Sequence, residues 1–124
     1  MSLSDKTKHW LKENCNISLN GKTVLVTGAN SGVGFKTAEI AVSLGANVIL
    51  ACRNTERAQE ARRKLICDYP EASISVMQLD LASLTSIEAF SEELVRNKVE
   101  IDVFVNNAGA FRQPGKRLRM DLTL

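Results

Sequence analysis

Four short apolar segments recur along the chain, at Thr23–Thr27, Asn47–Ala51, Ser73–Leu79 and Ile101–Val105. Three of them contain continuous apolar runs (Val-Leu-Val, Val-Ile-Leu-Ala and Val-Phe-Val) rather than an alternation of apolar and polar residues. Continuous runs are typical of strands that are buried on both faces, as in a parallel sheet. The pattern therefore predicts four strands, most of them buried.

Helical patterns separate these strands. The first covers Val33–Leu44 and is followed by Gly45, a residue that suits the left-handed end of a helix. The second begins at Asn54 or Thr55, both of which are good N-caps, and Pro70 ends it. A helix after each of the first two strands is what a parallel sheet needs for its crossover connections.

The third helical pattern places Ile87, Phe90 and Leu94 on one face, after a cap at Ser86 or a nearby hydroxyl. Strand and helix thus alternate three times before the fourth strand. This order predicts an α/β fold, the first half of a Rossmann-type doubly wound parallel sheet with strand order 3-2-1-4. Residues 1–20 form an amino-terminal extension with a short helix around Trp10, and residues 21–124 form a dinucleotide-binding domain that we expect to be incomplete at its carboxyl end.

A glycine-rich loop, Thr27-Gly28-Ala29-Asn30-Ser31-Gly32-Val33-Gly34, joins the first strand to the first helix. Free N–H groups at a helix N-terminus, together with the helix dipole, favour a phosphate. We expect Gly28 to permit the tight turn, Gly32 to let a pyrophosphate approach, and Gly34 to allow close helix–strand packing. Glycines after a strand can also make a simple turn, but the strand–turn–helix context favours the phosphate site. The spacing excludes a nucleoside-triphosphatase P-loop, because Val33 stands where that pattern needs glycine.

Three motifs follow three different strands in order: T-G-x-x-x-G-x-G from Thr27, Leu79-Asp80-Leu81, and Asn106-Asn107-Ala108-Gly109. With these motifs the chain resembles the short-chain dehydrogenase/reductase family over about residues 21–112. The sequences of the glycine loop and of Ala-Cys-Arg-Asn most resemble those of the retinol dehydrogenase and WW-domain oxidoreductase branch. Protochlorophyllide reductases are similar over the same stretch.

The resemblance implies roles at the carboxyl ends of the strands, where ligands of open parallel sheets bind. It implies that Asp80 accepts a hydrogen bond from the adenine amine; a cap on the following turn is the alternative. It also implies that Asn106 steadies the sheet, while the backbone after it lines the adenosine side of the cofactor. The candidate cofactor-binding residues are Gly28, Asn30, Ser31, Gly32, Val33, Gly34, Arg53, Asn54, Asp80, Leu81, Asn107, Ala108 and Gly109.

The end of the second strand indicates which dinucleotide is bound. An NAD site needs a carboxylate there for the ribose 2′-hydroxyl, but the chain has no acid before Glu56. Arg53 offers a planar fork for a 2′-phosphate, and Ser31 and Asn54 can add hydrogen bonds to it. Arg53 as a solvated residue before a helix is the alternative. We therefore predict NADP(H) as the cofactor.

Catalytic residues are not found in this chain. The resemblance implies a tyrosine acid/base, a lysine four residues later and a serine, but the one tyrosine, Tyr69, is followed at that distance by Ser73. Tyr69 also precedes the third strand, which places it at the opposite end of the sheet from the cofactor. The family's catalytic residues are expected beyond Leu124. We interpret the chain as the cofactor-binding part of an NADP(H)-dependent oxidoreductase acting on a small carbonyl or alcohol.

Two other hypotheses stay open: a non-catalytic dinucleotide-binding module or sensor, and a small structural or interaction protein without the ligand. The amino-acid composition does not distinguish between these hypotheses, but it argues against some kinds of ligand. The formal net charge of +2 is too balanced for a nucleic-acid surface, although basic residues gather in residues 110–124. Three widely spaced cysteines and one histidine indicate neither a disulfide framework nor a metal site. The chain has no membrane-length apolar run and no secretory signal, so we expect a reducing, cytoplasmic location. The fourth strand would be an apolar edge, so we expect a marginally stable or self-associating chain; the alternative is that residues 111–124 fold back over this edge.

Overall fold

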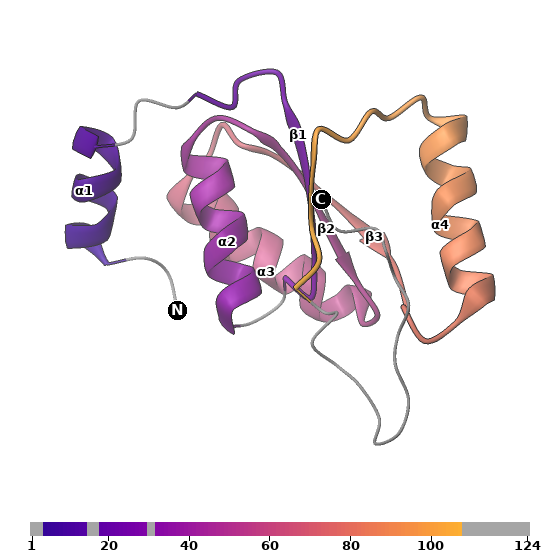
Figure 1. Cartoon of the computed structure of the whole chain (residues 1–124). Coiled ribbons are helices and arrows are strands. Elements are labelled where there is room, and N and C mark those ends of the chain that lie inside the picture. The colour runs from indigo at the N-terminus through magenta and orange to yellow at the C-terminus, as the bar shows by residue number, and fades with distance from the viewer. Residues whose placement is uncertain (1–3, 15–17, 30–31, 108–124) are drawn as a thin grey trace.

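A computed structural model describes residues 4–14, 18–29 and 32–107 of the chain (Figure 1). Four parallel strands form one sheet in the order β3-β2-β1-β4, which confirms the predicted order. The elements along the chain are α1 (Asp5–Asn14), β1 (Thr23–Thr27), α2 (Gly32–Ser43), β2 (Asn47–Cys52), α3 (Thr55–Asp68), β3 (Ser73–Gln78), α4 (Leu84–Arg96) and β4 (Val103–Val105).

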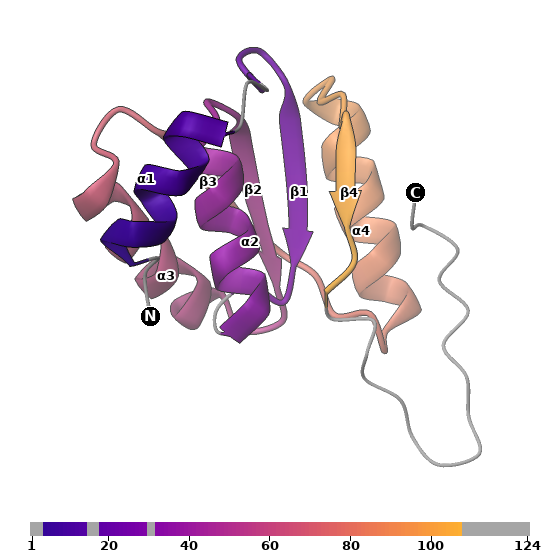
Figure 2. The same cartoon turned by 60° about the vertical axis from the view of Figure 1, so that its left-hand side comes forward.

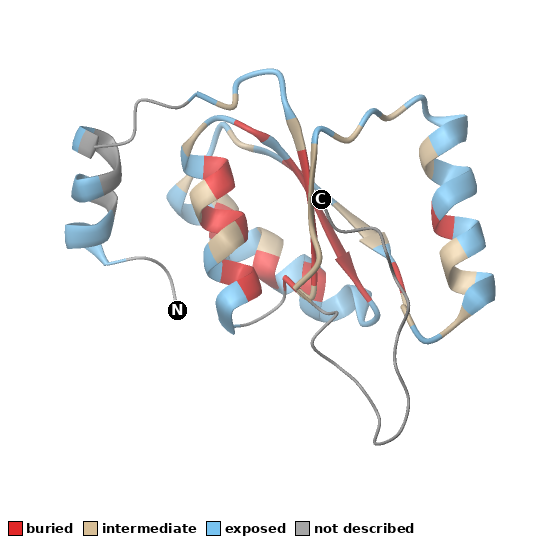
Figure 3. Ribbon diagram, in the orientation of Figure 1, coloured by how far each residue is buried: buried red, intermediate tan, exposed pale blue. Residues whose placement is uncertain are grey.

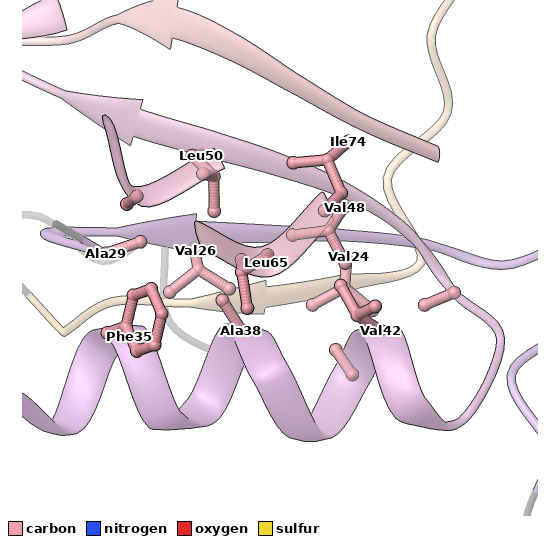
Figure 4. Close-up of a cluster of buried hydrophobic side chains, with 13 residues drawn as sticks. Val24, Val26, Ala29, Phe35, Ala38, Val42, Val48, Leu50, Leu65 and Ile74 are labelled. Atoms are coloured by element: carbon pink, nitrogen blue, oxygen red, sulfur yellow. The ribbon is translucent and has the colours of Figure 1, made fainter. Parts of the chain in front are cut away.

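Helices cover both faces of the sheet: α2 and α3 pack on one face and α4 on the other (Figure 2). Alternate residues of the central strands supply the two cores, because successive side chains of a strand point to opposite faces. Val24 and Val26 of β1 belong to the larger core with α2 and α3 (Figure 4). Leu25 between them belongs to the smaller core with α4. This two-sided burial explains the continuous apolar runs in the sequence.

Burial falls from the centre of the sheet to its edges (Figure 3). Four of the five residues of β1 and five of the six of β2 are buried, whereas all three residues of β4 are half-buried. The inner strands are therefore the rigid frame that fixes the loops at their carboxyl ends.

Some element ends differ from those predicted. The fourth strand is confined to Val103–Val105, rather than beginning at Ile101. Asp102 forms a bend there instead, since its carboxylate Oδ2 accepts the Thr23 N–H at 2.8 Å and its own N–H donates to the Thr23 carbonyl at 2.9 Å. A side chain that bonds to the neighbouring backbone competes with a regular ladder.

The helix signals are largely as the sequence predicts. Asn54 is the N-cap of α3, where its Oδ1 accepts two backbone N–H groups at 3.0 and 3.2 Å. Gly45 follows α2 with φ of +93°. Of the two alternatives for the cap of α4, the nearby hydroxyl is the one present: Ser83 is the N-cap, and the Ser86 hydroxyl bonds to Asp80. Within the described ranges, no helix is long and apolar enough to cross a membrane, and no cluster of His, Cys, Asp or Glu is arranged to hold a metal ion.

Candidate cofactor-binding site

The parallel sheet brings four separate loops to one edge. Gly28 follows β1, Arg53 follows β2, Asp80 lies two residues after β3, and Asn107 lies two residues after β4. Because all four strands run the same way, these positions share the carboxyl edge of the sheet, where open α/β folds bind their ligands. Residues that lie far apart in sequence are thus gathered at one place.

Gly28 and Gly34 make the closest contact in this region. Gly28 has φ of +63°, and its N–H donates to the Ala51 carbonyl at 3.1 Å, which continues the ladder between β1 and β2. A Cβ on Gly34 would lie 2.3 Å from the Gly28 carbonyl oxygen and 2.6 Å from Nδ2 of Asn107. Glycine is therefore required at position 34 for α2 to approach the end of β1, as the packing role predicts.

Asn107 fastens this contact from the far side of the loop. Its Nδ2 donates to the same Gly28 carbonyl at 3.2 Å, across 79 positions of sequence. One residue earlier, the Oδ1 of Asn106 lies 3.3 Å from the Thr27 hydroxyl, which also donates to the Val105 carbonyl at 3.3 Å. The two asparagines thus tie the end of β4 to the end of β1.

Thr27 is a site residue that sequence reasoning used only as part of a motif. It is buried, with 1% of its surface exposed, and its hydroxyl forms the link to β4 just described. A threonine at the end of an otherwise aliphatic strand is the signal that could have pointed to this role, because buried hydroxyls need hydrogen-bond partners.

Gly32 has the opposite environment from Gly34. Its φ is +61°, and a Cβ built on it would meet no atom of the described residues within 4 Å. It is the first residue of α2, so the free N–H groups of that helix's first turn begin here. The neighbouring Val33 is 72% exposed. The structure therefore offers an open approach to a helix N-terminus, the geometry that a phosphate needs.

The carboxyl end of β2 carries an exposed cation. Arg53 is exposed, directly after the buried Cys52, and the first acidic residue beyond it is Glu56 in α3. Asn54, which was expected to contribute a hydrogen bond to the same ligand, uses its Oδ1 to cap α3. Its Nδ2 keeps two donor hydrogens, the kind of group that a phosphate oxygen accepts from.

Asp80 lies in a tight turn between β3 and α4. Its Oδ1 accepts the Ala82 N–H at 3.0 Å, so the turn-capping role considered from the sequence is present. The carboxylate has a second oxygen, Oδ2, to which the described residues give no partner. Leu81 beside it is half-buried against the smaller core. Of the remaining candidates, Asn30, Ser31, Ala108 and Gly109 lie outside the described residues.

A profile of the short chain dehydrogenase family matches residues 22–123. The chain belongs to this family. Mouse (Mus musculus) retinol dehydrogenase 14 is 45% identical over 106 residues, which cover 77% of this chain and 32% of the relative. The human (Homo sapiens) WW domain-containing oxidoreductase is 47% identical over 94 residues, covering 76% and 23%. The chain thus spans about a third or less of these relatives, and the predicted branch of the family is confirmed.

Solved structures of short-chain dehydrogenases share the fold. Menthone neomenthol reductase from Mentha piperita superposes with a TM-score of 0.65 at 36% identity, covering 71% of this chain and 31% of that one. The Pseudomonas aeruginosa RhlG/NADP active-site complex gives 0.66 at 26% identity, covering 73% and 36%. The family consists of oxidoreductases that bind nicotinamide dinucleotides.

Tyr69 lies away from the site in this short-chain dehydrogenase. It ends α3 and precedes β3, so it is at the amino edge of the sheet. Its hydroxyl donates to Oε2 of the buried Glu39 at 3.3 Å. Burial is the main cause, and the charge of Glu39 the second cause, of the rise in the pKa of Tyr69 to about 12. A phenol at the opposite edge, with a pKa moved further from neutrality, is unsuited to acid/base work on a ligand bound at the carboxyl edge.

Proposed function

We propose that the chain forms the NADP(H)-binding part of an oxidoreductase that transfers hydride between nicotinamide and a small carbonyl or alcohol substrate. The observation that carries the proposal is the pair of glycines at the start of α2. Gly34 is held against Gly28 and Asn107, whereas a Cβ on Gly32 would meet no described residue within 4 Å. The loop is packed tightly on the side of Gly34 and leaves the helix N-terminus accessible on the side of Gly32. Such a loop is suited to the pyrophosphate of a dinucleotide.

The two ends of the dinucleotide have candidate partners on neighbouring loops. Oδ2 of Asp80 can accept the exocyclic amine of adenine, and the exposed Arg53 guanidinium can bind the 2′-phosphate of NADP(H) with paired, charge-assisted hydrogen bonds. The lack of a carboxylate at the end of β2 also favours the phosphate, because an acid there would repel it. The RhlG/NADP complex, a structural relative, gives a further reason to choose this cofactor.

The nicotinamide supplies a hydride donor or acceptor when the cofactor is bound. The chain's own residues bind and orient the cofactor. The first turn of α2 binds the pyrophosphate, Arg53 binds the 2′-phosphate, and Asp80 binds the adenine base. No residue of this chain is assigned proton transfer, because Tyr69 lies at the other edge of the sheet. A dinucleotide-binding module or sensor without turnover is the alternative, since the described residues that we assign bind and orient the cofactor.

Calorimetric titration of the chain with NADPH and with NADH tests the cofactor. We expect NADPH to bind more tightly, on the order of tenfold or more, because hydrogen bonds to charged groups contribute about 1.5–3 kcal/mol. Arg53→Ala should remove most of this preference while leaving NADH binding nearly unchanged. Arg57→Ala, another exposed arginine one turn into α3, is the matched control and should keep the preference.

Equal affinity for the two dinucleotides would refute the choice of NADP(H), and binding of neither would refute the site. Turnover of a carbonyl by the full protein would then separate the oxidoreductase from the sensor.

A further inference from the structure

The turn that carries Asp80 is held from several sides. The Asp80 N–H donates to Oγ of Ser86 at 2.9 Å, and the Asp80 carbonyl accepts the Ser83 N–H at 3.0 Å. The third bond, from the Ala82 N–H to Oδ1, fixes the carboxylate itself. Before the turn, the Leu79 N–H donates to the Cys52 carbonyl at 3.0 Å, which anchors it to β2. Backbone and side chain of Asp80 are thus both immobilised.

Ser86 makes the bond that does not belong to the helix. It is the third residue of α4, and the helix already has its N-cap, because Oγ of Ser83 accepts the Ser86 N–H at 3.2 Å. In a capping box the side chain at this position reaches back to the N–H of the cap residue. Here the Ser86 hydroxyl reaches three residues further back, to Asp80. Its bond holds the turn rather than the helix.

We propose that Ser86 is a positioning residue that sets the selectivity for adenine in the dinucleotide. The inference rests on the proposed function and deepens it. The N–H, the carbonyl and Oδ1 of Asp80 each have a partner, and Oδ2 is the acceptor to which the described residues give none. Removing the Ser86 hydroxyl takes away the partner of the Asp80 N–H, while the bonds from Ser83 and Ala82 remain. The turn is then held less firmly, and the carboxylate also samples orientations in which Oδ2 does not meet the base. Preorganised groups bind more tightly because no ordering cost is left at the moment of binding.

The chemistry of the base makes this role measurable. Adenine presents an amine that donates to a carboxylate, whereas hypoxanthine presents a carbonyl oxygen at the same position. A fixed Asp80 therefore favours NADPH over its hypoxanthine analogue, because the analogue leaves the carboxylate unpaired and places two acceptors together. A substitution that only destabilised the fold would weaken the binding of both ligands to the same extent.

The experiment measures the affinity of the full chain for NADPH and for reduced nicotinamide hypoxanthine dinucleotide phosphate, by the fluorescence of the bound reduced nicotinamide. We expect the parent to prefer NADPH on the order of tenfold or more, since the lost bond is to a charged group. Ser86→Ala should lower the ratio of the two affinities to about threefold or less, because it weakens the binding of NADPH alone. Ser86→Thr, which keeps the hydroxyl, should restore it.

Ser83→Ala is the matched control. It removes the cap from the same helix end and costs stability, about 1 kcal/mol, yet leaves the Ser86–Asp80 bond intact. We expect it to keep the parent's ratio. If Ser86→Ala does not fold, Ser86→Cys replaces it, because a thiol is a weak acceptor of similar size.

The outcomes separate the two proposals. An unchanged ratio in Ser86→Ala, or an equal loss for both ligands, overturns the role of Ser86. A parent that binds both ligands equally overturns it as well, because Asp80 then does not read the base. A parent that binds neither refutes the proposed function itself.

Discussion

Alanine at Gly34 should act mainly on stability and alanine at Gly32 mainly on NADPH binding, although the two glycines are two residues apart at the start of α2. A Cβ on Gly34 would lie 2.3 Å from a backbone oxygen, about 1.1 Å short of the 3.4 Å at which ordinary contact begins. The second obstacle, Nδ2 of Asn107, is held by its bond to Gly28. The first turn of α2 must therefore move away from β1.

The magnitude for Gly34→Ala follows from these two contacts. Overpacking of a rigid contact costs about 1–3 kcal/mol, and loss of the Asn107–Gly28 hydrogen bond adds about 1 kcal/mol. In a chain of this length 1 kcal/mol corresponds to about 4 °C in melting temperature. We therefore expect the melting temperature to fall by roughly 10 °C. The cost is a large share of the free energy of unfolding, which is about 5–15 kcal/mol for a domain.

For Gly32→Ala the cost is confined to the backbone. A Cβ there meets no part of the described chain within 4 Å, but the φ of +61° costs an alanine about 1 kcal/mol. The new methyl group would stand in the space that we assign to the pyrophosphate. We therefore expect a decrease of about 4 °C in melting temperature, together with a loss of NADPH affinity on the order of tenfold or more.

Thermal unfolding followed by circular dichroism, and NADPH titration at a temperature where both variants are folded, measure the two effects. A Gly34→Ala variant that melts with the parent would show that the close approach of α2 to β1 is not real. A Gly32→Ala variant that binds NADPH like the parent would place the phosphate elsewhere.

Two other residues give further predictions. Tyr69→Phe should cost about 1–2 kcal/mol in urea unfolding, because the buried Glu39 loses the phenol as a partner. Since the pKa of Tyr69 is raised from 10.0 to about 12, its contribution is present below pH 10 and is lost between pH 10 and about 12, so the variant should lose less stability over that range than the parent. Asn107→Ala should cost about 1 kcal/mol by removing the donor to Gly28, and should weaken NADPH binding several-fold.

The sheet was predictable from the sequence because its central strands are buried on two sides. Val24, Leu25 and Val26 must all be apolar, since neighbouring residues enter different cores. The helix ends were predictable wherever the signal was local, as at the Asn54 cap and at Gly45. Such signals depend on a few adjacent residues, so no knowledge of the tertiary structure is needed.

The contacts that complete the site depend instead on which strands become neighbours. The bond from Asn107 to Gly28 spans 79 positions and exists because β4 pairs with β1 rather than with β3. Ser86 was placed at a helix start by its residue type, but its partner was set by the turn that precedes α4. Short polar side chains have several local partners of similar energy, and the surrounding structure selects one.

The free edge of β4 leads to a last prediction, that the chain self-associates as its concentration rises. Among the described residues β4 pairs with β1 alone, and its three residues are apolar and half-buried. Because the Asp102 N–H donates to Thr23 on β1, and bonding alternates sides along a strand, the Val103 N–H points away from the sheet. Apolar edges with unpaired N–H and C=O groups add strands from other chains. Val103→Pro removes that donor at the first position of the strand, where proline is tolerated. Sedimentation of the parent over a concentration series should show dimers or larger species that the variant lacks. A parent that sediments as a monomer at every concentration would contradict this reasoning, as would a variant that associates equally.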